Sequence, residues 1–139
     1  MQPQVQITPS APVESQRPLR PAMLRAMRGR CPACGNGRLF RGYLKVADQC
    51  PECHEALHHQ RADDGPAYLT ILLVSHLGAP LLLISYVLWR PSAMTMLLSF
   101  GLGAVILSLL LLPLIKGAFI GLQWSQRMHG FGGAEPAST

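Results

Sequence analysis

Four cysteines in the first half of the chain have the spacing of a metal site. They form two Cys-Pro-x-Cys pairs, Cys31 with Cys34 and Cys50 with Cys53, and fifteen residues separate the pairs. Each pair aims two thiolates at one point, and the segment between the pairs is long enough to form a hairpin and return. The pattern predicts a structural Zn²⁺ in a tetrahedral site of four thiolates.

The sequence alone allows other roles for these cysteines. Two disulfides are disfavoured, because the charge distribution places this segment in the cytosol, which is reducing. A redox dithiol would need a thioredoxin-like βαβ pattern, which does not surround the pairs. Cys50-Pro-Glu-Cys53-His54 matches the haem-attachment motif, but such attachment is expected on the outer side of a bacterial membrane and leaves Cys31 and Cys34 without a role. Haem stays an alternative to zinc.

Three histidines, His54, His58 and His59, follow the second pair. Any of them could replace a cysteine or bind a second metal ion. Because four thiolates already complete a tetrahedral shell, we expect a polar, solvated segment here. His54 and His58 are kept as possible additional ligands.

The segment that carries the cysteines, 31–62, is expected to form a zinc ribbon. Between the pairs, residues 38–46 are rich in strand-forming side chains. Alternation places Phe40, Leu44 and Val46 on one side of a short hairpin, and Arg41, Tyr43 and Lys45 on the other. A ribbon this short has too small a core to fold alone, so a bound metal would supply the missing stability.

Two apolar segments dominate the rest of the chain. Neither Ala67–Trp89 nor Ala93–Ile115 contains a charged residue, and Arg90-Pro91-Ser92 separates them. As a helix, each segment is about 34 Å long, enough to cross a hydrocarbon core of ~30 Å. The expected fold class is a membrane protein, with a small cytosolic zinc ribbon followed by a two-helix transmembrane hairpin over 63–127. The second helix is expected to run on through the membrane interface.

The charge distribution orients this hairpin. Nine Lys and Arg residues precede the first span, Arg90 lies in the connecting turn, and two basic residues follow the second span. The positive-inside rule places both termini in the cytoplasm. Only 14% of the chain is charged, against about 25% in soluble domains. With no nucleophile–base motif and no phosphate-binding glycine loop, the sequence predicts no enzyme.

The two ends of the chain are expected to lie outside these units. Residues 1–21 are rich in proline and poor in large apolar side chains, which predicts a disordered tail. Residues 128–139 are expected to form a flexible tail. Residues 22–30 are a short basic connector, for which contact with anionic lipid headgroups and plain solvation are both open.

Charged residues flank the spans on the cytosolic side. Asp63 and Asp64 precede the first span, where they can cap the helix. Lys116 follows the second span at the same side of the membrane. A carboxylate–Lys116 pair could lock the hairpin or bind a partner, and Arg41 and Lys45 of the ribbon are further candidates for partner contact.

His76 lies near the middle of the first span. A titratable group at that depth is costly, so His76 is a candidate ligand of a metal or haem, or a proton relay. The alternative is a neutral histidine that is hydrogen-bonded across the helix pair, to Ser99 or Ser108.

Small residues recur at helix-packing spacing in and after the second span. The pairs are Ser99/Gly103, Ala104/Ser108 and Gly117/Gly121. Such pairs let two backbones approach closely, which favours either packing within the hairpin or self-association.

Several of these residue groups together resemble a known family. They are Cys31-Pro-Ala-Cys34-Gly35, Tyr43-Leu44-Lys45-Val46, Cys50-Pro-x-Cys53, Ala62-Asp63-Asp64-Gly65-Pro66, His76 and Lys116-Gly117. Over about residues 22–127 the chain is similar to domain-of-unknown-function family 983. The resemblance implies a small bacterial inner-membrane protein of alphaproteobacterial type, with two spans and a cytosolic zinc-binding motif.

The resemblance also implies an accessory role, because members are often encoded near genes for cytochrome oxidase assembly. It implies no catalytic residues. The chain departs from the family at two places: His54 stands where a glycine is usual, and Ser85-Tyr86 stands where a glutamate is frequent near the end of the first span. Because such a glutamate would be the relay partner of His76, its absence argues against a proton relay through His76.

Two functions of different class follow from these patterns. The first is a non-enzymatic accessory protein, whose ribbon presents a surface to a larger membrane complex while the hairpin anchors it in the lipid bilayer. The second is metal, haem or redox handling through His76 and the His/Cys cluster. Membrane-tethered nucleic-acid binding is disfavoured, because the ribbon has modest positive charge and no aromatic stacking platform.

Overall fold

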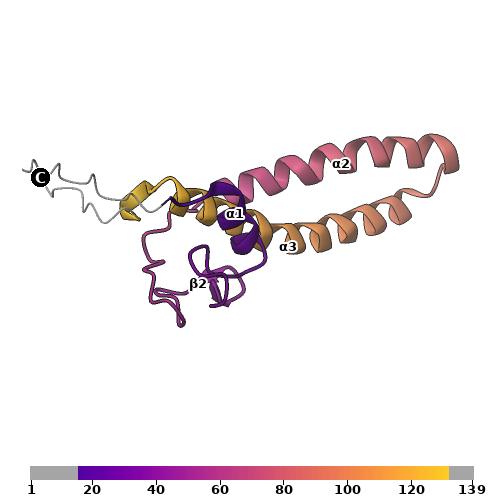
Figure 1. Cartoon of the computed structure of the whole chain (residues 1–139). Coiled ribbons are helices and arrows are strands. Elements are labelled where there is room, and N and C mark those ends of the chain that lie inside the picture. The colour runs from indigo at the N-terminus through magenta and orange to yellow at the C-terminus, as the bar shows by residue number, and fades with distance from the viewer. Residues whose placement is uncertain (1–15, 132–139) are drawn as a thin grey trace, which may run out of the picture.

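The computed structural model describes residues 16–131. Its elements, in chain order, are α1 (Leu19–Met27), β1 (Phe40–Gly42), β2 (Lys45–Val46), α2 (Gly65–Trp89), α3 (Ala93–Ser125) and the 3₁₀ turn η1 (Met128–Gly130). In Figure 1 the long helices α2 and α3 form a hairpin, and α1 and the small β-hairpin lie at the end away from the α2–α3 turn. The expected fold class, a four-cysteine ribbon followed by two long apolar helices, is confirmed.

Both long helices match the charge-free segments of the sequence. Each is long and apolar enough to cross a membrane, and almost none of the residues in the most apolar part of each is buried. A soluble helical hairpin would bury one face of each helix, so this exposure fits helices that face lipid. Between them, Arg90 ends α2 in a left-handed conformation. The Ser92 hydroxyl caps α3 by accepting from Thr95 N at 3.3 Å.

The helix α3 continues beyond its charge-free segment. From Lys116 to Ser125 it adds about 15 Å of helix. The buried residues of α3 all lie at or after the end of the apolar segment: Ile115, Gly117, Ile120, Gly121, Gln123 and Trp124. We call residues 116–125 the α3 extension, and it is the platform for the rest of the protein.

The segment expected as a basic connector is largely helical, because α1 covers Leu19–Met27. This helix crosses the α3 extension at two glycines. A Cβ atom on Gly117 would overlap the Ala26 carbonyl oxygen, and one on Gly121 would lie 2.8 Å from the Ala22 carbonyl oxygen. The Gly117/Gly121 pair therefore receives α1, and not α2.

The hydrophobic core lies between the ribbon, α1 and the α3 extension. Its buried members include Leu39 and Leu57 of the ribbon and Ile120 of α3, all 0% exposed. Phe40 pairs with Val46 in the β-hairpin, and both pack against this core. Alternation predicted that Leu44 shares this face. Instead, Leu44 lies in the turn between the strands, with a left-handed backbone (φ 58°).

The ends of the described chain also pack. Phe131 is 4% exposed and lies with Ala22 and Trp124 in a second small core. Residues 128–131 therefore belong to the folded unit, in contrast to the flexible tail expected from 128 onward. The remainder of the two predicted tails, residues 1–15 and 132–139, lies outside the described residues.

Candidate metal centre

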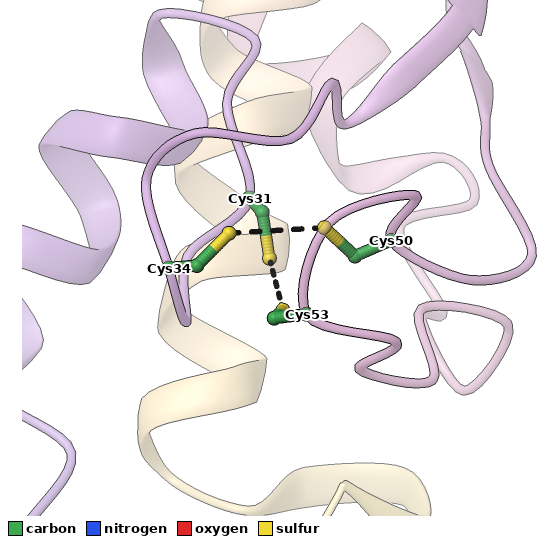
Figure 2. A group of neighbouring side chains, drawn as sticks. All are labelled: Cys31, Cys34, Cys50 and Cys53. Carbon is green, nitrogen blue, oxygen red and sulfur yellow. Dashed lines mark hydrogen bonds between the residues drawn. The ribbon is translucent and has the colours of Figure 1, made fainter.

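The four cysteine side chains converge from two loops on one point (Figure 2). The Sγ atoms of Cys31 and Cys53 lie 3.7 Å apart, those of Cys34 and Cys50 lie 3.8 Å apart, and all four lie within 4.8 Å of one another. Four sulfurs at the Zn–S distance of ~2.3 Å in a regular tetrahedron are about 3.8 Å apart. The cluster therefore has the size of a tetrahedral tetrathiolate site.

The geometry separates this interpretation from the alternatives. A disulfide needs an S–S distance of about 2.05 Å, and all four cysteines are free. Both cysteines of the haem-like motif point into the cluster (Figure 2), so neither is turned toward a separate cofactor. The arrangement favours a metal ion held by all four sulfurs.

The two cysteine pairs have the same backbone geometry. After the first pair, Gly35 N donates to Cys31 O at 2.9 Å; after the second, His54 N donates to Cys50 O at 3.1 Å. Both donors have a left-handed backbone, with φ of 75° at Gly35 and 59° at His54. The sequence repeat thus folds into two matching turns that aim their thiols inward.

Gly37 is the residue that lets the two turns meet. Its Cα faces the cluster so closely that a Cβ atom would overlap Cys50 Sγ. Its N–H points at Cys34 Sγ over 3.5 Å, and Asn36 N does so over 3.4 Å. The Gly37 N–H contact, with that of Asn36, lowers the pKa of Cys34 to about 6. Cys34 therefore reaches the thiolate form that binds metal near neutral pH.

Burial shifts the pKa of Cys31 in the opposite direction to that of Cys34, because Cys31 is 0% exposed. Removal from water raises the pKa of Cys31 well above its ordinary value, because a thiolate without a counter-charge is poorly solvated there. A metal cation at the cluster would offset that cost, since it binds the deprotonated form.

The cysteine cluster is fixed to the helices by polar contacts. Arg25 of α1 donates to Ala33 O in the first turn at 3.1 Å. The Gln123 side chain on α3 accepts from Arg61 N and donates to Arg61 O, each at 2.9 Å. The ribbon is therefore docked on α1 and the α3 extension rather than joined to them by a loose linker.

Trp124, near the end of α3, packs against the ribbon. It is 7% exposed, and its Nε1 donates to Glu55 Oε1 at 2.9 Å. The Arg17 guanidinium lies 4.6 Å from the Trp124 ring centroid and 3.7 Å from the Glu55 carboxylate. Sequence reasoning missed this contact, because Arg17, Glu55 and Trp124 are far apart along the chain.

The histidines after the second pair do not join the cluster. Among the described residues, the group with metal-ligand geometry consists of the four cysteines alone. His58 stacks against His59 with ring centroids 4.1 Å apart, and His59 lies edge-on to Phe131 at 5.8 Å. His54 is exposed and lines a small surface pocket with Cys53 and His59.

His76 is exposed on α2 and stays within its own helix. Its Nδ1 lies 2.8 Å from Leu72 O, four residues earlier. Of the two cross-helix partners that the sequence suggested, Ser99 and Ser108, Ser99 donates its hydroxyl to Thr95 O within its own helix at 2.7 Å. His76 therefore lies apart from the cysteine cluster and forms no joint site with it.

Of the charged residues predicted for partner contact, Lys116 takes an internal partner. Its Nζ donates to Leu44 O at 2.6 Å, which ties the α3 extension to the β-hairpin turn. Asp63 and Asp64 are exposed, and Asp64 occupies the N-cap position of α2 without a side-chain capping bond. Arg41 pairs with Asp48 at 3.5 Å, and Lys45 is exposed.

Tyr43 makes a contact that the sequence did not predict. Its hydroxyl donates to Leu109 O at 2.6 Å, inside the apolar part of α3. In a regular helix this carbonyl would accept from the N–H four residues later, but residue 113 is a proline and has no N–H. The hairpin thus supplies the donor that α3 lacks.

The comparisons with known proteins place the chain in a family. A family model described as "Protein of unknown function (DUF983)" matches residues 40–124, which include the second cysteine pair, α2 and α3 up to Trp124. No curated protein and no solved structure was found to be similar. The match covers more than half of the 139 residues, and the chain belongs to the DUF983 family.

Proposed function

We propose that this protein is a non-enzymatic accessory protein of the bacterial inner membrane, with a structural Zn²⁺ bound by Cys31, Cys34, Cys50 and Cys53. The observation that carries the proposal is the cluster of four sulfurs, with pair distances of 3.7 and 3.8 Å, in a ribbon docked on the α3 extension. Zinc prefers such closed thiolate sites for structural roles, because no coordination position is left open for a substrate.

In this proposal the ribbon and both termini lie in the cytoplasm. The support is the excess of Lys and Arg before the first span, against the single Arg90 in the turn between the helices. With three residues between α2 and α3, the periplasmic side has no room for a domain, so the surface offered to a partner is cytoplasmic.

The proposed partner is a larger membrane complex, bound through the docked ribbon and the start of α2. Asp63 and Asp64 support this, because they are exposed while their neighbours are packed: Ala62 is 6% exposed, and Gly65 lies close to Phe119 of α3. Assembly of cytochrome oxidase is the context that the family's gene neighbourhood suggests.

The first experiment measures metal and haem per chain in protein purified in mild detergent under reducing conditions. We expect one Zn²⁺ and no haem. Gly37→Ala should lose the metal, because its new methyl group would overlap Cys50 Sγ. Gly42→Ala is the matched control, since its Cβ would meet only Lys45 at an ordinary 3.9 Å.

A His76→Leu variant separates structural zinc from metal or haem handling. We expect it to keep full zinc content, because His76 bonds to Leu72 within α2 and is not in the cysteine cluster. Covalent haem in the wild type, or loss of bound metal from His76→Leu, would contradict the proposed function.

A further inference from the structure

The tip of the β-hairpin reaches the depth of the membrane-spanning part of α3. Tyr43 bonds to Leu109 O, and Leu109 lies about 10 Å along the helix from Lys116, the first charged residue after the apolar segment. The backbone of the tip is held nearer the surface, where Lys116 Nζ donates to Leu44 O at 2.6 Å.

These two bonds place the tip at the boundary between hydrocarbon and headgroups. The apolar segment, about 34 Å as a helix, exceeds the ~30 Å hydrocarbon core only slightly, so Lys116 marks the boundary closely. The Tyr43 ring therefore points from the headgroup layer into the upper hydrocarbon. Tyrosine is enriched at this depth because its ring is apolar and its hydroxyl is polar.

Basic residues lie close to Tyr43 in the chain and at the end of α1 near Lys116. Arg41 and Lys45 lie two residues to either side of it and are exposed. Arg28 is also exposed and caps the end of α1, the end that lies against Gly117, next to Lys116.

These charges are poorly compensated within the protein. The one carboxylate partner among the described residues is Asp48, in an ion pair with Arg41 whose side chains are 51% and 75% exposed, and such open pairs are weak. Within residues 16–131, the side chains of Arg28 and Lys45 have no hydrogen-bond or ion-pair partner. Three cations at headgroup depth are complementary to lipid phosphates.

We propose that the hairpin tip and the end of α1 form a binding site for anionic phospholipid, in which Arg28, Arg41 and Lys45 hold the headgroup phosphate and Tyr43 sets the depth of the tip. The zinc ribbon is then a membrane-surface module in its own right, seated on the bilayer beside the helix hairpin. This inference does not depend on the identity of the metal or of the protein partner.

The test is a native mass spectrometry titration of the full chain in detergent, with phosphatidylglycerol and with phosphatidylcholine. The wild type should retain phosphatidylglycerol preferentially. Arg41→Gln/Lys45→Gln should weaken that retention at least about fivefold.

Arg20→Gln/Arg61→Gln is the matched control. It removes the same charge from exposed positions farther from the membrane, since α1 meets Gly121 near Ala22 and the Arg61 backbone bonds to Gln123. We expect this control to bind phosphatidylglycerol like the wild type.

Three outcomes would overturn the proposal: equal retention of the two lipids by the wild type, an equal loss in the control pair, or displacement of phosphatidylglycerol by millimolar inorganic phosphate. The last would show a site for free phosphate rather than lipid. Zinc content is measured for every variant. Should the Arg41/Lys45 variant lose zinc, Arg28→Gln decides the question, because Arg28 lies outside the ribbon and should still weaken retention.

Discussion

At the scale of single residues, His54 occupies a backbone position that suits glycine. Its φ of 59° matches that of Gly35 at the equivalent point of the first cysteine turn, where φ is 75°. An L-residue in this conformation brings Cβ close to the following carbonyl oxygen. Histidine in place of the usual glycine therefore strains the backbone here and lowers the stability of the fold. The structure gives His54 no role as a metal ligand that would offset this loss.

Replacing His54 by glycine should stabilise the metal-loaded protein by about 1 kcal/mol, because the left-handed conformation costs glycine nothing. The measurement is chemical denaturation in detergent, followed together with release of the bound metal. His58→Gly is the control: His58 has no left-handed backbone, so the substitution should be neutral or destabilising. Loss of the bound metal from His54→Gly would instead identify His54 as a ligand.

At the scale of secondary-structure elements, α3 combines two helices of different kind. Its apolar part is long enough to cross a membrane and is hardly buried, while its extension and the adjoining Ile115 carry every buried residue of the helix. Pro113 lies just before the change from one part to the other. The carbonyl that this proline leaves open, Leu109 O, accepts from Tyr43, so the β-hairpin completes the hydrogen bonding of a membrane helix.

A double-mutant cycle tests this contact. Tyr43→Phe should destabilise the wild-type protein by about 1 kcal/mol, the net contribution of a typical hydrogen bond. In a Pro113→Ala background the loss should be much smaller, because the backbone N–H restored at position 113 can donate to Leu109 O. The readout is the free energy of unfolding of each of the four proteins in detergent.

Tyr68→Phe serves as the control for loss of a tyrosine hydroxyl, because Tyr68 lies on α2 and is 69% exposed. It should change stability little in either background. Equal effects of Tyr43→Phe with and without Pro113 would contradict the proposed role of Tyr43.

At the scale of the whole molecule, the protein has one tightly packed end and one open end. The ribbon, α1 and the α3 extension share a core. Away from it, α2 and α3 leave a groove of about 600 Å³ between them, lined by small and apolar residues that include Gly78, Phe100 and Gly103. A Cβ atom on Gly78 or Gly103 would meet nothing within 4 Å, so the Ser99/Gly103 pair does not bring α2 and α3 together.

Removing the metal should therefore unfold the packed end and spare the long helices. We expect chelation to shift the fluorescence of Trp124 to the red, because Trp124 bonds to Glu55 of the ribbon, while far-UV circular dichroism keeps most of its helical signal. The measurement uses Trp89→Phe, which leaves Trp124 as the single tryptophan.

The matched control is Trp124→Phe, which leaves Trp89 at the far end of α2. Its emission should not change on chelation. If the emission of Trp124 stays unshifted after the metal has been removed, the ribbon holds its fold without metal, and the proposed structural role of the metal is wrong.

The sequence by itself determined the parts whose signals are local. Two long charge-free segments specify two long helices, because chain length and hydropathy decide whether a helix can cross a membrane. The spacing of Cys31, Cys34, Cys50 and Cys53 specified one shared site, since each turn positions its own two thiols. These features need no knowledge of which distant residues meet.

Only the tertiary structure decided how the ribbon is held. The buried face of α1 consists of Ala22 and Ala26, which are too small to give a strong apolar period, and their partners Gly117 and Gly121 show only that something packs closely there. Tyr43 meets Leu109, 66 residues away in the chain, because a proline removes a donor that sequence patterns do not count. Contacts of this kind depend on shape and on unpaired backbone groups, and these exist only once the helices and the ribbon are placed together.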